Sequence, residues 1–240
     1  MLEMFASFAP RRAAVALGKL LQNPDDLPQV FTMVEALSGP TPELLRRRLH
    51  ATAEGARLLR DRPEIAPLLA DRAALASLPE GSLGRAYLAF MESEGISAEG
   101  IVAASMQGRA TAIEGEGDAE RVYFQRRMRD THDLWHAVTG YRGDILGESA
   151  LLGFIMAQTG NPGIGLLFAA ALVKTRAEPG ASRLILEGFR RGHRAAWFVD
   201  VAWEELLSRP VHEVRLELGI DALPVYVPLR SAEVPMAAAA

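Results

Sequence analysis

The sequence predicts an all-α protein: a single compact bundle of about ten helices with an irregular C-terminal tail. Apolar residues recur at helical spacing nearly throughout the chain, whereas the alternation typical of strands is almost absent. Glycines and prolines interrupt this pattern at short intervals, and connections that short favour neighbouring helices within one domain. We therefore expect one domain over residues 1–240, with an irregular tail after about residue 221.

The helix boundaries follow from these interruptions, because glycine and proline end helices. A turn is expected at residues 81–84, with Ser82 as the N-cap of the helix that follows. The longest non-helical stretch is expected at residues 107–117. The other breaks are expected at Asn23-Pro24, Gly39-Pro40, Pro63, Pro79, Gly95, Gly140 to Gly143, Gly160 to Pro162, and Pro179-Gly180.

Composition excludes several classes of site. The chain has no cysteine, so a metal would have to be bound by imidazole, carboxylate or carbonyl groups. The formal net charge is −4, which provides no general positive field for nucleic acid.

The first residues do not resemble a secretory signal, because an acidic residue precedes the short apolar stretch and basic residues lie within it. The apolar stretch from Ala150 to Val173 is interrupted by Gln158, Asn161 and Pro162, so we expect two buried helices joined by a turn rather than a membrane span.

Residues 126–148 hold the pattern that carries chemistry. His132 and His136 are four residues apart, so on a helix their imidazoles project from one face, one turn apart. Asp133 comes three residues before His136 and reaches the same side. A histidine pair at this spacing also occurs as an ordinary structural feature, but an acid on the same face favours a metal site.

Glu148 is the fourth expected ligand. It comes twelve residues after His136, beyond a glycine-containing turn, at the start of a second helix. Apolar residues at offsets of three, four, seven and eight place it on the core-facing stripe of that helix. A buried carboxylate stays charged only beside a cation or strong hydrogen bonds, and a metal ion would supply the cation.

Other polar residues have alternative interpretations. Two imidazoles with two carboxylates suit zinc, iron(II) or manganese, and the ligand types do not choose between them. Arg129 lies one turn before the ligands, so it is a candidate for orienting the acidic group of a substrate or for supporting Asp133. It equally suits an ordinary ion pair within a helix. The remaining histidines are expected to be structural or exposed: His50, His193 and His212.

The motif resembles the hallmark of the Coq-four family of ubiquinone biosynthesis proteins, which reads His-Asp, two residues, His, eleven residues, Glu. Here these positions are His132, Asp133, His136 and Glu148. The resemblance covers most of the chain. It includes Asn23-Pro24-Asp25-Asp26, the residues from Gly81 to Tyr87, Trp203-Glu204-Glu205, and the residues from Arg215 to Ile220.

The resemblance implies an all-helical protein that binds a divalent metal at those four positions, with zinc favoured over iron or manganese. It implies a homodimer, cytoplasmic and peripheral on the inner face of the membrane, which acts with other quinone-biosynthesis proteins on a prenylated quinone precursor or another isoprenoid lipid. The activity it implies is oxidative decarboxylation, in which hydroxyl replaces the carboxyl group on ring carbon one. We expect the helices of residues 149–173 either to line an apolar passage for the isoprenoid tail or simply to form core.

Two alternatives remain open. In the first, the chain is a non-catalytic, lipid-binding scaffold of the biosynthetic complex, and the metal only holds two helices together. In the second, the His-Asp pair belongs to a metal-dependent phosphohydrolase that also uses His50 and Asp200. Turnover of a prenylated hydroxybenzoate separates the first alternative from the enzyme, and release of phosphate from simple phosphoesters tests the second.

Overall fold

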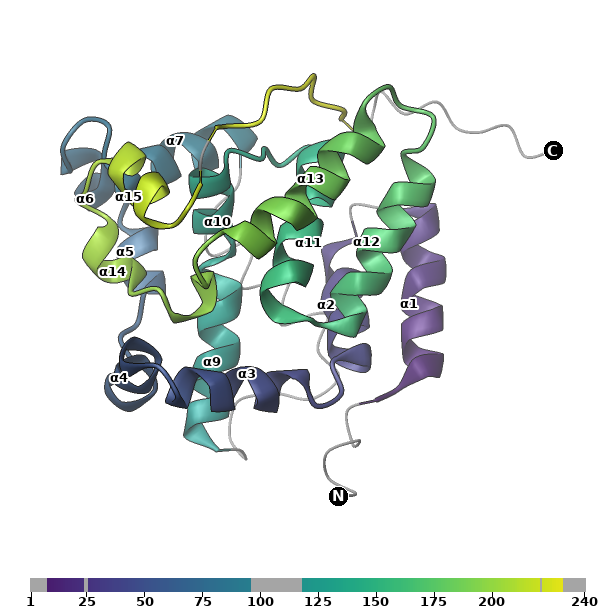
Figure 1. The fold of residues 1–240 in the computed structure, drawn as a ribbon, viewed down its shortest axis with the longest axis horizontal. Coiled ribbons are helices and arrows are strands. Elements are labelled where there is room, and N and C mark those ends of the chain that lie inside the picture. The colour runs from purple at the N-terminus through teal and green to yellow at the C-terminus, as the bar shows by residue number, and fades with distance from the viewer. Residues whose placement is uncertain (1–7, 24–25, 96–117, 221, 231–240) are drawn as a thin grey trace.

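The computed structural model describes residues 8–23, 26–95, 118–220 and 222–230. Within these residues the protein is helical and contains no strand, which confirms the predicted fold class. Figure 1 shows α10 and α11 at the centre of the molecule, between α6 and α15 on one side and α1 and α12 on the other. The elements are α1 (Pro10–Gln22), α2 (Leu27–Leu37), α3 (Thr41–His50), α4 (Ala53–Asp61), α5 (Ala66–Ala70), α6 (Arg72–Ser77), α7 (Leu83–Glu94), α9 (Ala119–Asp130), α10 (His132–Thr139), α11 (Ile145–Thr159), α12 (Pro162–Lys174), α13 (Ala181–Arg194), the 3₁₀ helix η2 (Phe198–Asp200), α14 (Trp203–Leu206) and α15 (Val211–Glu217).

Most predicted helix ends agree with the structure. Ser82 caps α7 by accepting a hydrogen bond from the Arg85 amide. α10 and α11 end before Gly140 and Gly160, whose φ angles of 78° and 64° lie in the left-handed region that glycine adopts without strain. Short helices such as α5 and α14 raise the number of helices above the expected ten or so. The predicted loop at residues 107–117 lies outside the described residues.

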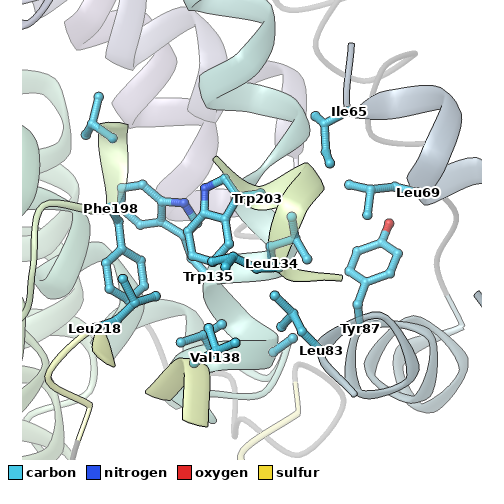
Figure 2. Packing of buried hydrophobic residues seen from close by; sticks show 14 of the residues in the cluster. Ile65, Leu69, Leu83, Tyr87, Leu134, Trp135, Val138, Phe198, Trp203 and Leu218 are labelled. Carbon is cyan, nitrogen blue, oxygen red and sulfur yellow. The ribbon is translucent and has the colours of Figure 1, made fainter. Parts of the chain in front are cut away.

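The main core surrounds α10. Every residue of this helix from Asp133 to Thr139 is buried. Trp135 packs edge-to-face against Phe154 and Phe198, with ring centroids 6.0 and 5.3 Å apart, and Phe198 packs against Trp203 at 5.4 Å. Figure 2 shows Trp135, Phe198 and Trp203 of this cluster, with aliphatic side chains around them. The dense packing holds the α10 backbone in place, and the candidate metal ligands project from that backbone.

α11 and α13 approach each other closely because glycines occupy their interface. A Cβ atom at Gly188 would lie 2.1 Å from the carbonyl oxygen of Ala150, and one at Gly192 would lie 2.6 Å from that of Phe154. Gly153 of α11 faces the backbone of α13 in the same way. These contacts bring α13 onto the helix that carries Glu148.

A second, smaller core joins α1, α2 and α12. Its buried residues are small or flexible, for example Ala13, Ala16 and Met33. The two helices expected within residues 150–173 are present as α11 and α12, but only α11 is largely buried. On α12, Leu166 and Val173 are exposed. No helix in the described part of the chain is long and apolar enough to cross a membrane.

Candidate metal centre

α10 brings three of the predicted ligands together. One ligand atom each from His132, Asp133 and His136 can be chosen so that all three lie within 4.8 Å of one another. The two imidazole rings meet edge-on, with centroids 4.9 Å apart. This is the arrangement that the spacing of four residues on one helix predicts. In the described residues, no second group of three such side chains is found.

His136 is the most constrained member of the site. Its side chain is only 1% exposed and stacks on Phe90 of α7 at a centroid distance of 4.9 Å. Its Nδ1 lies 2.9 Å from the backbone oxygen of Tyr141, which can only accept, so Nδ1 carries a proton and donates it there. The buried Nε2 has no hydrogen-bond partner among the described residues. A ring fixed in this way directs Nε2 into the site.

His132 and Asp133 form the adjoining part of the site. The Nδ1 atom of His132 lies 3.1 Å from Oδ1 of Asp133. Asp133 is buried, whereas the side chain of His132 is 36% exposed. The centre therefore lies at the edge of the core, with His132 on its solvent side.

Glu148 reaches the centre from the first turn of α11. Its Oε1 atom lies 3.2 Å from Nε2 of His136, although the two are not aligned as a hydrogen bond. The expectation of a core-facing carboxylate is wrong, because the side chain is 47% exposed. α11 is apolar on nearly all sides, so an apolar stripe along its sequence does not mark one buried face.

The charges of this pair are coupled. Burial lowers the pKa of His136, but the charge of the neighbouring Glu148 outweighs it and raises the pKa to about 9. Burial raises the pKa of Glu148, and the charge of His136 more than reverses this, so the net shift is downward. A proton on His136 therefore occupies the place that a cation would take between the imidazole and the carboxylates. The orphaned Nε2 atom and the donor set fit a divalent metal.

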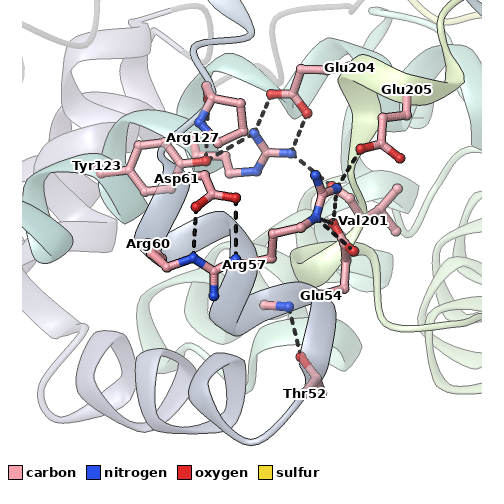
Figure 3. Close-up of polar contacts among 12 residues, drawn as sticks. Thr52, Glu54, Arg57, Arg60, Asp61, Tyr123, Arg127, Val201, Glu204 and Glu205 are labelled. Carbon is pink, nitrogen blue, oxygen red and sulfur yellow. Dashed lines mark hydrogen bonds and ion pairs between the residues drawn. The ribbon is translucent and has the colours of Figure 1, made fainter.

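Buried ionic contacts fix the helix that precedes α10. Arg127 of α9 donates to both carboxylate oxygens of Glu204 and to the carbonyl of Val201, and the exposed fractions of the Arg127 and Glu204 side chains are only 5% and 13%. Figure 3 shows this contact beside a second, more exposed cluster of ion pairs around Arg57. Because only Thr131 separates α9 from α10, the Arg127 contact also fixes where α10 starts.

Two arginines cover the other end of α10. Arg215 donates to the carbonyls of Ala137 and Val138, and Arg191 donates to the carbonyl of Thr139. These carbonyls form the negative end of the helix dipole, so cations there are favourable.

Arg129 lies near the centre but is engaged locally. Its Nε donates to Oδ1 of the adjacent Asp130 at 2.6 Å, and the two side chains are 10% and 6% exposed. No contact between Arg129 and Asp133 is found in the described structure. Its role towards a substrate stays a prediction.

The other histidines lie elsewhere. His50 pairs with Glu120 at 3.0 Å and is half-exposed. His193 packs edge-on against Phe189, and His212 is exposed. Neither His50 nor Asp200 joins the group formed by His132, Asp133 and His136, so the ligand set expected for a phosphohydrolase does not assemble.

Several supporting residues were not predicted. Phe90 stacks on His136 from α7, and the carbonyl of Tyr141 orients the same ring. Neither contact leaves a signal at motif spacing. Asp144 accepts hydrogen bonds from the amides of Leu146 and Gly147 and so caps α11. An aspartate just before an apolar helix is a recognisable capping signal that would have identified it.

The coupled pair makes a prediction about pH. The raised pKa of His136 stabilises the folded, chelator-treated protein below about pH 6.5, and this stabilisation is lost as pH rises towards about 9. We expect the unfolding free energy to fall by about 2 kcal/mol over that interval, allowing for solvent around the half-exposed Glu148. Denaturant titrations from pH 6 to 10 measure this. His212→Gln should show the same fall of the unfolding free energy with pH. If His136→Gln shows that fall as well, the pH dependence comes from another group.

Comparison with known proteins agrees with the motif. The family described as Coenzyme Q (ubiquinone) biosynthesis protein Coq4 matches residues 11–224. The mitochondrial ubiquinone biosynthesis protein COQ4 homolog of Mus musculus is 32% identical over 218 residues, which cover 90% of this chain and 79% of the mouse protein. The mitochondrial ubiquinone biosynthesis protein coq4 of Talaromyces stipitatus is 34% identical over 215 residues, covering 87% of this chain and 70% of the fungal protein.

A solved structure shares the fold. A crystal structure of a candidate ubiquinone biosynthesis protein from Nostoc punctiforme matches with a TM-score of 0.66 at 22% identity. The match covers 90% of this chain and 100% of the other. The family match and the curated relatives both cover most of this chain, and the matched region includes the motif of residues 132–148. The chain therefore belongs to the Coq4 family of coenzyme Q (ubiquinone) biosynthesis proteins.

Proposed function

We propose that this ubiquinone biosynthesis protein is a metal-dependent enzyme that carries out oxidative decarboxylation of a polyprenylated, hydroxybenzoate-derived precursor. The observation that supports it most is the buried Nε2 atom of His136, which has no hydrogen-bond partner among the described residues and faces the carboxylate of Glu148 at 3.2 Å. A buried imidazole nitrogen that faces carboxylates requires a positive charge beside it, which a proton supplies in the metal-free protein and a metal ion would supply in its place. His132, Asp133, His136 and Glu148 would hold that cation, with zinc favoured and iron(II) or manganese compatible.

The proposed reaction replaces the ring carboxyl group by hydroxyl. The carboxyl carbon leaves as carbon dioxide, one atom of dioxygen enters the ring as hydroxyl, and an external two-electron donor reduces the other atom to water. A bound divalent metal would supply positive charge next to the ring carboxylate and the oxygen substituents that gain charge during the reaction. Zinc has no redox chemistry, so with zinc the electron-rich ring itself would have to react with dioxygen, a difficulty that iron removes.

Arg129 has a separate proposed role in this reaction. Its Nε is bound by Asp130, and the two terminal nitrogens of its guanidinium have no polar partner in the described structure. A planar pair of donors matches a carboxylate. We propose that these two nitrogens bind the acidic group of the substrate, and that Asp130 orients the Arg129 side chain.

The isoprenoid tail needs an apolar surface. The side chains of Leu151 and Phe154 on α11 are fully buried in the core, so they do not line a passage. α12 offers a partly exposed apolar face that includes Leu166 and Val173. In our proposal the tail lies along α12 while the protein rests, as a homodimer, on the inner face of a membrane beside other quinone-biosynthesis proteins.

Turnover of a prenylated hydroxybenzoate by purified protein tests the proposal. Protein loaded with Zn²⁺, Fe²⁺ or Mn²⁺ is supplied with dioxygen and a reductant, and carbon dioxide and the hydroxylated ring are measured. We expect Arg129→Gln to lower kcat/KM by about 10- to 100-fold with unchanged metal content, because a charge-assisted hydrogen bond contributes roughly 1.5–3 kcal/mol.

Arg72→Gln is the matched control, because Arg72 is also paired with a carboxylate but lies on the exposed surface of α6. Its kcat/KM should equal that of the wild type. A wild-type protein that binds metal and lipid but turns over no precursor with any of the three metals would reject the enzyme in favour of the scaffold.

A further inference from the structure

Residues 222–230 form an extended segment, here called the C-terminal strap, that crosses the loop between α10 and α11 (Figure 1, yellow). This loop, residues 140–144, connects the helix of His136 to the helix of Glu148. Leu223 and Pro224 lie so close to Gly140 that a Cβ atom there would be 2.8 and 3.1 Å from them. At the far end of the strap, Arg230 pairs with Glu94 of α7 at 3.0 Å.

The strap binds the loop mainly through Asp144. The amide of Leu229 donates to Oδ1 of Asp144 at 3.0 Å, and the hydroxyl of Tyr226 donates to Oδ2 at 2.8 Å. In return, the amide of Ile145 donates to the carbonyl of Leu229 at 2.9 Å. Asp144 is only 2% exposed, so these partners replace the water that its charge would otherwise require.

The hydroxyl of Tyr226 packs against the backbone of Arg142 and Gly147. Its oxygen also accepts a hydrogen bond from the amide of Arg142 at 2.9 Å. A Cβ atom at Gly147 would lie 2.4 Å from that oxygen, so glycine is needed where the hydroxyl enters. Burial raises the pKa of Tyr226, and the hydrogen bond to Asp144 raises it further, so the hydroxyl is protonated and donates at neutral pH.

Asp144 in turn sets the position of Glu148. Its carboxylate accepts from the amides of Leu146 and Gly147, and its carbonyl accepts from the amide of Glu148 at 2.8 Å. Asp144 therefore accepts hydrogen bonds from three backbone amides of the first turn of α11 and fixes the position of that turn. The carboxylate of Glu148 is half-exposed and has no polar partner besides His136 among the described residues, so its direction depends on the backbone of that turn.

We propose that Tyr226 is a positioning residue for Glu148: the strap holds Asp144, Asp144 holds the first turn of α11, and that turn aims the Glu148 carboxylate at the metal centre. The inference rests on the proposed metal centre and adds the C-terminal strap to its supporting shell. Residues that orient a metal ligand without touching the metal contribute about 10- to 100-fold to metal affinity. Tyr226 belongs to this class.

The experiment compares Tyr226→Phe with Tyr123→Phe. Both changes remove one hydroxyl. The hydroxyl of Tyr123 donates to the carbonyl of Pro63 and accepts from the guanidinium of Arg127, away from Glu148. A third variant, Val225→Ser, changes the strap at a side chain that is 99% exposed and so controls for the segment itself. Zn²⁺ affinity is measured by competition with a chromophoric chelator, and amide hydrogen exchange is followed at Leu146 and Gly147 in chelator-treated protein.

We expect Tyr226→Phe to bind Zn²⁺ about 10- to 100-fold more weakly than the wild type and to exchange faster at both amides. Tyr123→Phe and Val225→Ser should bind Zn²⁺ as the wild type does. A general loss of stability would weaken Tyr123→Phe as well, so the difference between the two phenylalanine variants isolates positioning.

Two results overturn the inference, and they are distinguishable. If the wild type binds Zn²⁺ and Tyr226→Phe binds it as tightly as Tyr123→Phe, the strap does not position Glu148 and the metal centre stands. If the folded wild type itself binds no Zn²⁺, Fe²⁺ or Mn²⁺, the proposed centre falls and the positioning role falls with it.

Discussion

His136→Ala is expected to abolish metal binding and turnover together. In the proposed centre the imidazole is the most buried nitrogen ligand, and its contact with the carbonyl of Tyr141 holds Nε2 in place, so alanine leaves the buried side of the centre without a ligand. Loss of a direct ligand should exceed the roughly 10- to 100-fold cost of losing a supporting partner, so we expect Zn²⁺ affinity to fall by more than about 100-fold. Metal content after dialysis and turnover of the prenylated precursor measure both effects.

Controls separate this effect from damage to the core. His50→Ala removes another histidine that pairs with a carboxylate, but on the surface, and should keep full metal content. His132→Ala removes a proposed ligand whose side chain is 36% exposed, so this variant should lose the metal with a smaller cost to folding. Full metal occupancy in a folded His132→Ala or His136→Ala protein would show that the ion is bound elsewhere.

Gly188→Ala is expected to destabilise the protein by about 3 kcal/mol, which lowers Tm by roughly 6–12 °C in a chain of this size. The new Cβ atom would lie 2.1 Å from the carbonyl oxygen of Ala150. Backbone cannot move aside as a flexible side chain can, so α13 must shift away from α11. Thermal unfolding of the purified variant measures the loss.

Gly18→Ala is the matched control for this substitution. Gly18 lies in α1 and is exposed, and a Cβ atom there would have no other atom within 4 Å. Alanine is the better helix former, so this variant should be more stable than the wild type by about 0.5–1 kcal/mol. Equal Tm values for the two variants would mean that the close approach of α11 and α13 is not rigid.

The fold class and much of the centre were predictable from local sequence. Helical periodicity predicts the helices, and Gly140 and Gly160 mark two of their ends. The spacing of His132 and His136 places their imidazoles together because helix geometry is the same in every protein. The rest of the site depends on contacts between residues that are distant in sequence. Phe90 comes from another helix and leaves no signal at motif spacing.

The sequence by itself therefore determined the helices and the grouping of His132, Asp133 and His136, since both follow from interactions within a few residues of the chain. Only the tertiary structure decided that Glu148 meets His136 with a half-exposed carboxylate, and that Tyr226 secures its turn through Asp144. The direction of one helix relative to another depends on packing across the whole core, as at Gly188. Such packing sums many weak contacts, and no single one is visible in a local pattern of residues.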